Sequence, residues 1–276
     1  MNGLERIAMA FAAAKDENRG ALMPYFTLGY PDPATSLDVV EAIAHAGADL
    51  IELGFPFSDP LADGPTIQHS TQVALEQGVN AAQCIEMVAE LRSRGVTQPF
   101  MLMGYINPIL AFGVERFVTE VAKVGADGFI VPDLPPEEGA EVEAACRAHG
   151  RALVYLLAPT SPPERIELLA SRTTGFLYLV SLAGVTGARD ALPPHLADFI
   201  QRVRAAAYSG AVAHTPLAVG FGISTPEQAR AVGQLADGVI VGSALIKAVG
   251  EAAGRDADPA KAAADFVHSL RVGLEG

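Results

Sequence analysis

Two carboxylates stand eleven positions apart in the stretch LIELGFPFSDPLADGPTIQHS, residues 50–70. The first, Glu52, is flanked by isoleucine and leucine, and no lysine or arginine lies within ten residues on either side of it. A buried carboxylate without a partner takes up a proton, because burial disfavours the charged form. Such a group suits general acid–base catalysis, in which one side chain donates a proton and then accepts one. A structural ion pair with a remote arginine is the alternative interpretation.

The second carboxylate, Asp63, has a different setting, in the loop sequence PLADGP. Aspartate before glycine is most often a turn residue, so the pattern alone favours a structural role. Asp59 and Asp133 each lie next to a proline, and a turn-forming role is likewise the simpler interpretation for both.

Three glycine-rich turns suggest where an anion would bind: AGVTG at 183–187, GFGIS at 220–224 and VGSA at 241–244. The last two lead into predicted helices, with Ser224 and Ser243 in N-cap-like positions. Glycine lets the backbone approach a ligand, and the N–H groups of a helix N-terminus bind phosphate. The three turns together predict a phosphate site, although each alone is also compatible with an ordinary capped turn.

Other chemistries fit the residues poorly. A Schiff-base aldolase needs a lysine inside the fold, but the four lysines fall outside the predicted strands. The six histidines are scattered and form no pair of metal ligands, and no nucleophile-elbow motif accompanies a serine. The residues therefore favour acid–base catalysis by carboxylates on a phosphorylated substrate, without a cofactor or metal in this chain.

The scaffold that must position these residues follows from the hydrophobic pattern. Eight mostly apolar β-type runs alternate with helical patterns, at 21–28, 49–54, 100–105, 128–132, 152–158, 176–181, 216–221 and 238–243. Continuously apolar runs are typical of parallel strands covered on both faces. We therefore predict a single (β/α)₈ TIM-barrel domain over 1–276, with an extra N-terminal helix at about 3–16 and a last helix at 259–274. An open doubly wound sheet is the alternative, but its Gly-x-Gly-x-x-Gly fingerprint is missing.

In such a barrel the active site lies at the C-terminal ends of the strands. That rule selects Glu52, Asp59, Asp63, Asp133, Tyr178 and Ser181. An aspartate also precedes three of the strands, in AGADLIELG, VGADGFIVPD and LADGVIVGS, as repeated βα units would produce.

Composition excludes some partners. The 276 residues carry a formal net charge of −13, which argues against non-specific binding to nucleic acid or anionic membranes. No apolar run approaches the roughly 18 residues of a membrane span, and the first residues do not resemble a signal peptide. Two cysteines in predicted helices, Cys84 and Cys146, fit reduced thiols, so we expect a cytoplasmic protein.

The stretch ELGFPFSDPLADGPTIQ strongly resembles the signature of the tryptophan synthase alpha subunit family. MPYFTLGYP, LMGYINPI, VPDLP, LAGVTG and GFGIST match other segments of that family in the same order, so the resemblance covers nearly the whole chain. It implies a (β/α)₈ barrel with extra helices. It also implies a lyase of tryptophan biosynthesis, which cleaves indole-3-glycerol phosphate to indole and glyceraldehyde 3-phosphate by a retro-aldol reaction.

The same resemblance implies roles for single residues. Glu52 matches the catalytic glutamate, which protonates indole C3 and handles the proton of the glycerol hydroxyl. Asp63 matches the catalytic aspartate, which engages the indole N–H and stabilises its developing positive charge. The other matches are the active-site tyrosine Tyr178, Thr186 of the loop after strand 6, the phosphate-binding Gly187, Gly222, Gly242 and Ser243, and the indole-pocket residues Tyr25, Leu102 and Phe221.

The family resemblance further implies a partner, a beta subunit that uses pyridoxal phosphate to join indole to serine. Indole would pass through a tunnel between subunits of an α₂β₂ heterotetramer. The loop around Asp59 and Pro60 and the region near Asn107 and Pro108 match the contact surface.

The sequence departs from the family pattern at two places, and it leaves alternative functions open. Leu182 stands where some members have arginine, and the stretch 205–216 is longer than usual. The alternatives are a stand-alone indole-3-glycerol-phosphate lyase, a non-catalytic module that activates the beta subunit, and a different phosphate-binding barrel such as an epimerase or decarboxylase. The glycine content also predicts that 182–193 is mobile without ligand.

Overall fold

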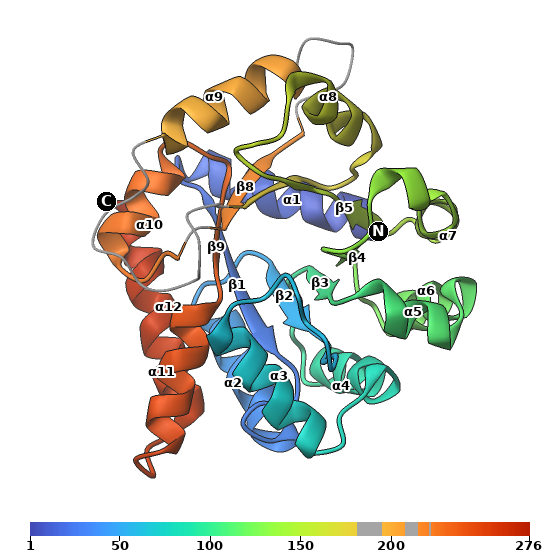
Figure 1. The fold of residues 1–276 in the computed structure, drawn as a ribbon. Coiled ribbons are helices and arrows are strands. Elements are labelled where there is room, and N and C mark those ends of the chain that lie inside the picture. Colours follow the sequence, from blue (N-terminus) through green and yellow to red (C-terminus); the bar gives the residue numbers. More distant parts are fainter. Residues whose placement is uncertain (181–194, 208–214, 221) are drawn as a thin grey trace.

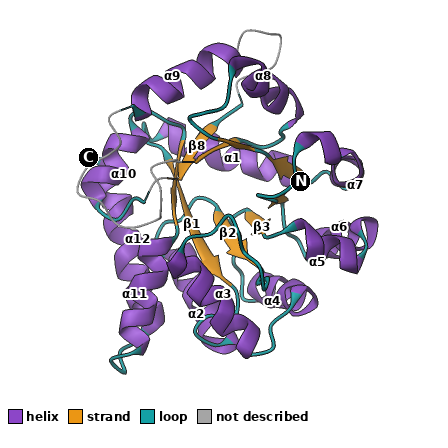
Figure 2. Cartoon of the chain, in the orientation of Figure 1, coloured by secondary structure: helices purple, strands orange, loops and turns teal. Residues whose placement is uncertain are grey.

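The computed structural model describes residues 1–180, 195–207, 215–220 and 222–276, and the remaining segments are drawn as grey traces in Figure 1. Strands form the centre of the fold, and helices surround them (Figures 1 and 2).

The strands of the described residues are parallel and short. They are β1 (Ala21–Thr27), β2 (Ile51–Gly54), β3 (Phe100–Met103), β4 (Gly128–Ile130), β5 (Ala152–Val154), β6 (Leu156–Leu157), β7 (Leu177–Val180), β8 (Leu217–Gly220) and β9 (Gly238–Val241). Each predicted strand is present. The predicted run 152–158 is divided into β5 and β6 at Tyr155, whose backbone N–H donates to Thr173 Oγ1 over 3.0 Å.

The order of the strands shows how the sheet closes. It runs β5-β4-β3-β2-β1-β9-β8-β7-β6, and its first and last members are two parts of one run of chain. The sheet therefore closes on itself, as a (β/α)₈ barrel requires, and the open doubly wound alternative is wrong.

Helices follow the strands around the outside of the barrel (Figure 1). Their bounds are α1 (Gly3–Asp16), α2 (Pro33–His45), α3 (Pro65–Glu76), α4 (Ala81–Ser93), α5 (Ile106–Phe112), α6 (Val114–Lys123), α7 (Ala140–Ala148), α8 (Pro163–Arg172), α9 (Leu196–Ala207), α10 (Pro226–Gly233), α11 (Ser243–Ala253) and α12 (Pro259–Glu275). The extra N-terminal helix is confirmed as α1, which begins with a capping box between Asn2 and Glu5. The last predicted helix is α12, which packs against α2, α10 and α11.

Helix α1 packs against one end of the barrel interior. Ile7, Phe11 and Ala14 are buried in the same cluster as the inward-facing strand residues, and the ring centroid of Phe11 lies 5.7 Å from that of Phe176. That inner cluster comprises Ala21, Met23, Leu50, Met101, Ile130, Ala152, Val154, Phe176, Tyr178, Ala218 and Ile240. A larger cluster fills the space between strands and outer helices. The two layers position the strand ends, where the site residues begin.

The aspartates that precede three strands act as clamps at the N-terminal end of the barrel. Asp49, Asp127 and Asp237 each accept a hydrogen bond from the backbone N–H of a neighbouring strand, on Leu22, Phe100 and Leu217 over 2.7, 2.9 and 2.9 Å. Each aspartate also donates its own backbone N–H to the carbonyl of the same partner residue. The sequence repeat therefore marks a repeated contact that fixes strand register.

Arginines form ion pairs with all three of these aspartates, and Asp237 pairs with Arg204 over 3.7 Å. Asp127 is fully buried and forms ion pairs with Arg6, Arg92 and Arg151. Asp49 forms ion pairs with Arg19 and Arg271. A buried charge needs such partners because removing it from water is costly.

Candidate active site

Glu52 lies on β2 and faces the barrel interior. It pairs in register with Tyr25 of β1 and Met101 of β3, and its exposed fraction is 0%. Neither carboxyl oxygen has a hydrogen-bond partner, and no ion pair reaches it, among the described residues. Burial raises the pKa of Glu52 well above its usual value. Burial therefore favours the neutral form of Glu52, which is able to donate a proton, whereas Asp127 has arginine partners.

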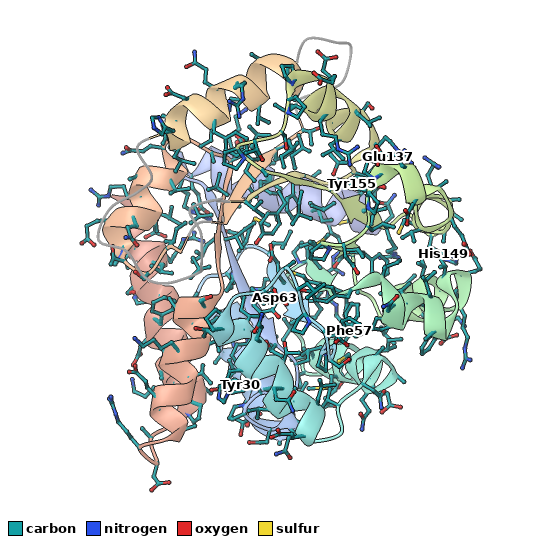
Figure 3. The ribbon with its side chains drawn as sticks, viewed as in Figure 1. Tyr30, Phe57, Asp63, Glu137, His149 and Tyr155 are labelled. Atoms are coloured by element: carbon teal, nitrogen blue, oxygen red, sulfur yellow. The ribbon has the colours of Figure 1, made fainter. Side chains whose placement is uncertain are left out.

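Asp63 lies in the loop after β2, half-buried at the C-terminal end of the strands. It projects near the centre of the view in Figure 3, inside the ring of helices, whereas His149 lies at its edge. Burial raises the pKa of Asp63 to about 6, against the opposing effect of a hydrogen bond from Tyr105. Asp63 is thus mainly an anion at pH 7. It is less open to solvent than its loop sequence suggests.

Tyr105 is a residue that the sequence did not single out. Its Oη donates to Asp63 Oδ2 over 3.0 Å and accepts from the backbone N–H of Ala62 over 2.9 Å. Its ring lies 5.4 Å from that of Phe57, between centroids. Tyr105 lies two residues after the end of β3, so the rule that strand ends carry the site could have selected it.

Two further tyrosines, Tyr25 and Tyr178, lie close to the carboxylates. Burial, together with the nearby charge of Asp63, raises the pKa of both phenols well above the usual value, so both are neutral. Glycines make room for them. A Cβ at Gly54 would lie 2.1 Å from Tyr25 Oη, and one at Gly220 would lie 2.8 Å from Tyr178 Oη.

A pocket of about 530 Å³ opens beside these tyrosines. Its described lining residues are Tyr25, Thr66, Ile67, Met103, Tyr178, Gly220, Gly222, Ile223, Ser224, Ile240, Gly242, Ser243, Ala244, Lys247, Ala248, Glu251 and Phe266. The volume suits a small-molecule ligand. Lys247 is the one lysine or arginine in this described lining.

The N-terminus of α11 reaches this pocket. Gly242 is its N-cap residue, without a side chain that could satisfy the first N–H groups, and Ser243 is its first residue. Uncapped N–H groups at a helix N-terminus form a site for an anion. The pocket therefore combines an anion-binding end with an aromatic wall.

Comparison with known proteins identifies the family. The model of the family described as "Tryptophan synthase alpha chain" matches residues 11–274. The chain belongs to the tryptophan synthase alpha chain family. The function predicted from the sequence is thereby confirmed at the level of the family.

Relatives of this family are similar over most of the chain. A tryptophan synthase alpha chain of Chloroflexus aggregans is 52% identical over 243 residues, covering 88% of this chain and 89% of the relative. One from Roseiflexus sp. is 49% identical over 268 residues, 97% and 100% of the two chains. The crystal structure of tryptophan synthase subunit alpha from Legionella pneumophila str. Paris has a TM-score of 0.90 at 37% identity, covering 100% of this chain and 99% of the other.

One residue assigned from the family resemblance lies elsewhere. Leu102 was predicted to line the indole pocket, but its side chain belongs to the outer cluster between strands and helices. Met103, the next residue of β3, lines the pocket instead. Successive side chains of a strand point to opposite faces, so a shift of one position changes the face.

The helix caps also differ from the prediction. Thr225, not Ser224, is the N-cap residue of α10, where it forms a capping box with Gln228. Ser224 donates its backbone N–H to Gln228 Oε1 over 2.8 Å. Ser243 is the first helical residue of α11, one position after the cap.

Several residues of the family's motifs lie outside the described residues. These are Thr186, Gly187, Phe221 and Ser181, together with Leu182, the whole of 182–193 and the part 208–214 of the long stretch before β8. The predicted mobility of 182–193 stays a prediction.

The other acidic residues have structural contacts. Asp133 accepts a hydrogen bond from the backbone N–H of Ile106 over 2.9 Å, at the start of α5. Asp59 accepts one from Ser58 Oγ over 2.5 Å. The four lysines all lie on helices, outside the strands as predicted, and Lys247 of α11 lines the pocket. Among the described residues, no cluster of three potential metal ligands occurs, and no helix is long and apolar enough to span a membrane.

Proposed function

We propose that this protein cleaves indole-3-glycerol phosphate to indole and glyceraldehyde 3-phosphate by general acid–base catalysis. The single observation that carries the proposal is the contrast between two carboxyl groups at one end of the barrel. Burial favours the neutral form of Glu52, whereas Asp63, with a pKa of about 6, is mainly ionised at pH 7. Two carboxyls with different proton affinities can divide acid and charge-stabilising roles.

The phosphate would bind at the N-terminus of α11. The backbone N–H groups after Gly242 point outward from the helix end, and the helix dipole favours an anion there. Lys247 lies one helical turn further along the same helix and lines the same pocket. These groups offset the repulsion between an anionic substrate and a protein of net charge −13.

Glu52 would carry the proton transfers. In its neutral form it donates a proton to C3 of the indole ring, which turns the ring into an electron sink. The resulting carboxylate then accepts the proton of the glycerol hydroxyl at the bond to be broken. The O–H electron pair forms the aldehyde C=O, and the C–C bond breaks. Its electron pair returns to the ring, so Glu52 ends protonated and no external reactant is consumed.

Asp63 would stabilise the intermediate. Protonation of C3 leaves positive charge on the indole nitrogen, and a nearby anion stabilises that charge in a site with little water. The N–H of the ring can also donate a hydrogen bond to the carboxylate. Tyr105 donates a hydrogen bond to Asp63 and so restrains its carboxylate. No cofactor or metal in this chain takes part in this scheme.

An indole-release assay on the purified chain tests the proposal. We expect indole and glyceraldehyde 3-phosphate in equal amounts from wild-type protein. We expect Glu52→Gln to lower kcat by about 100-fold or more with the fold retained. Glu76→Gln on the exposed surface of α3 is the matched control and should leave kcat unchanged. Normal turnover by Glu52→Gln would refute the proposal.

We also propose that the chain acts in the cytoplasm with a beta subunit that carries pyridoxal phosphate, in an α₂β₂ assembly. The surface around Asp59, Pro60 and Asn107 supports this assignment, because large apolar side chains are exposed there. Leu61 is 92% exposed and Leu110 is 54% exposed. The hydrogen bond from Ala62 to Tyr105 ties this surface to the catalytic Asp63.

Titration with a purified beta subunit tests the partner. We expect a complex of 2:2 composition by light scattering and faster indole release on binding. Leu61→Asp should weaken the complex and leave the rate of the isolated chain unchanged. Maximal turnover without any partner, and no complex at micromolar concentrations, would favour a stand-alone lyase. Partner activation without any indole release by the chain would favour a non-catalytic module.

A further inference from the structure

Three hydroxyl groups form a buried chain from the pocket to helix α3. Tyr25 Oη lies 3.3 Å from Thr27 Oγ1, which lies 2.7 Å from Ser70 Oγ. Ser70 Oγ donates to the backbone carbonyl of Ile67 over 2.9 Å. Thr27 and Ser70 have no exposed surface, so water does not compete for these hydrogen bonds.

The backbone carbonyl of Ile67, the last acceptor in this series of hydroxyls, determines the direction in which each hydroxyl donates. A carbonyl oxygen can only accept, so the single proton of Ser70 is used toward Ile67. The oxygen of Ser70 must then accept from Thr27, and the oxygen of Thr27 must accept from Tyr25. The phenol proton of Tyr25 is therefore directed into the chain, and a lone pair of its oxygen remains on the other side.

That oxygen lies close to both proposed catalytic carboxyls. Tyr25 pairs in register with Glu52, and it lines both the 530 Å³ pocket and a small adjoining cavity that Asp63 and Tyr105 also line. Its Oη lies beside Gly54 at the end of β2, where a Cβ would lie 2.1 Å away. When the phenol proton points toward Thr27, the side of Tyr25 Oη that faces these carboxyls carries a partial negative charge and cannot donate a hydrogen bond to them.

We propose that Thr27 and Ser70 are positioning residues that fix Tyr25 as a hydrogen-bond acceptor and thereby keep the proton on Glu52. The inference rests on the proposed function, in which Glu52 is the proton donor. No hydrogen bond joins Tyr25 to Glu52 in the structure, so the O–H dipole acts across the space between them. A tyrosine free to donate would instead stabilise the carboxylate and lower its proton affinity.

Other groups also face the two carboxyls, and they remain in place when the series of hydrogen-bonded hydroxyls is interrupted at Thr27. Tyr178 faces Glu52 from β7, and Tyr105 contacts Asp63 from the end of β3. Lys247 and Glu251 line the pocket from α11. None of these four donates to or accepts from Thr27 or Ser70 in the structure. A change at Thr27 therefore isolates the effect of Tyr25.

The pH dependence of kcat for indole release tests the proposal. Activity needs protonated Glu52, so it declines as the pH rises through the pKa of that carboxyl. Thr27→Val keeps the shape of the side chain and removes the hydroxyl, which frees the Tyr25 proton. We expect the alkaline midpoint to move down by about 0.5 to 1 pH unit. Thr27→Ser, which keeps the hydroxyl, should restore the wild-type midpoint.

Two further variants separate this role from a structural one. Ser36→Ala removes another fully buried hydroxyl, which is not one of the three hydroxyls from Tyr25 to Ser70. This hydroxyl accepts from the backbone N–H of Gly29 and donates to the backbone carbonyl of Pro33. It should lower the melting temperature and leave the midpoint unchanged. In a Tyr25→Phe background, Thr27→Val should shift nothing further, because the effect passes through Tyr25.

The outcomes distinguish this inference from the proposed function. If Thr27→Val lowers kcat equally at every pH and the midpoint stays, the inference is wrong, even though Glu52→Gln remains inactive. A further shift by Thr27→Val without the Tyr25 hydroxyl would also overturn it. Full activity of Glu52→Gln would instead overturn the proposed function itself.

Discussion

Tyr105 Oη lies 3.0 Å from Asp63 Oδ2 and donates a hydrogen bond to it, although the two residues are 42 positions apart in the chain. The same oxygen accepts from the N–H of Ala62, next to Asp63. One phenol therefore fixes both the backbone and the carboxylate of the loop after β2. This contact decides how the proposed charge-stabilising group meets the substrate.

Removal of that phenol should change the acid limb of the pH profile. The hydrogen bond from Tyr105 opposes the rise in the pKa of Asp63, so Tyr105→Phe should raise that pKa further above about 6. The anionic form is then lost at a higher pH as the pH falls. We expect the acidic midpoint of kcat/KM to move upward and activity at pH 6 to decline about 3- to 10-fold.

The matched control for this variant is Tyr155→Phe. Tyr155 Oη donates to Glu143 over 2.7 Å, and Figure 3 shows Tyr155 apart from Asp63. Its loss should leave the acidic midpoint unchanged. Equal shifts in both variants would show that the Tyr105 effect is not specific to Asp63.

Glu52 should lower the free energy of unfolding at neutral and alkaline pH. Its pKa in the folded protein is raised above the value in the unfolded chain, so its contribution is favourable below about pH 4 and is lost as the pH rises toward the folded pKa. Glu52→Gln should therefore unfold at higher urea concentration than wild type at pH 8. We expect a gain of about 1 to 3 kcal/mol, and little difference at pH 4. A loss of stability at pH 8 would contradict this account.

Adjacent residues of β3 should have opposite effects on function and stability. Met103 lines the pocket, so Met103→Ala should raise KM several-fold with a modest change in stability. Leu102 is buried in the outer cluster, so Leu102→Ala should lower the free energy of unfolding by about 2 to 5 kcal/mol and leave KM close to wild type. Steady-state kinetics and urea unfolding measure both. A raised KM in Leu102→Ala with an unchanged KM in Met103→Ala would indicate that Leu102 lines the pocket after all.

The clamp at Asp127 should matter for stability alone. Asp127→Asn would leave Arg6, Arg92 and Arg151 close together without their counter-charge. We expect about 3 to 5 kcal/mol of lost stability in urea unfolding, with the pH midpoints of indole release unchanged. Shifted midpoints would show that the two ends of the barrel are electrostatically coupled.

The sequence predicted the architecture because parallel strands covered on both faces are continuously apolar. The same property hides which face each residue occupies. In FMLM of β3 nothing alternates, so Leu102 and Met103 could not be assigned to opposite sides. Glu52 could be assigned because a lone acid in an apolar strand has few interpretations, and the structure supports the interpretation of a neutral group.

Contacts between residues far apart in the sequence could not be predicted from the sequence. Asp63 looked like a solvent-exposed turn residue, and only the fold brings Tyr105 against it and removes water. The hydroxyl chain likewise joins Thr27 to Ser70 across 43 positions. The caps of α10 and α11 differ by one residue from their predicted positions, because sequence patterns locate helix ends only to within a residue or two.

Direct titration of the Glu52 carboxyl tests the central claim. Carbon-13 NMR of protein labelled at the glutamate side-chain carboxyl, with the Glu52→Gln spectrum to assign the signal, follows its protonation between pH 3 and 9. The account predicts a carboxyl that is still protonated at pH 7, while exposed glutamates titrate near 4.3. A Glu52 signal that titrates together with those exposed glutamates would contradict it.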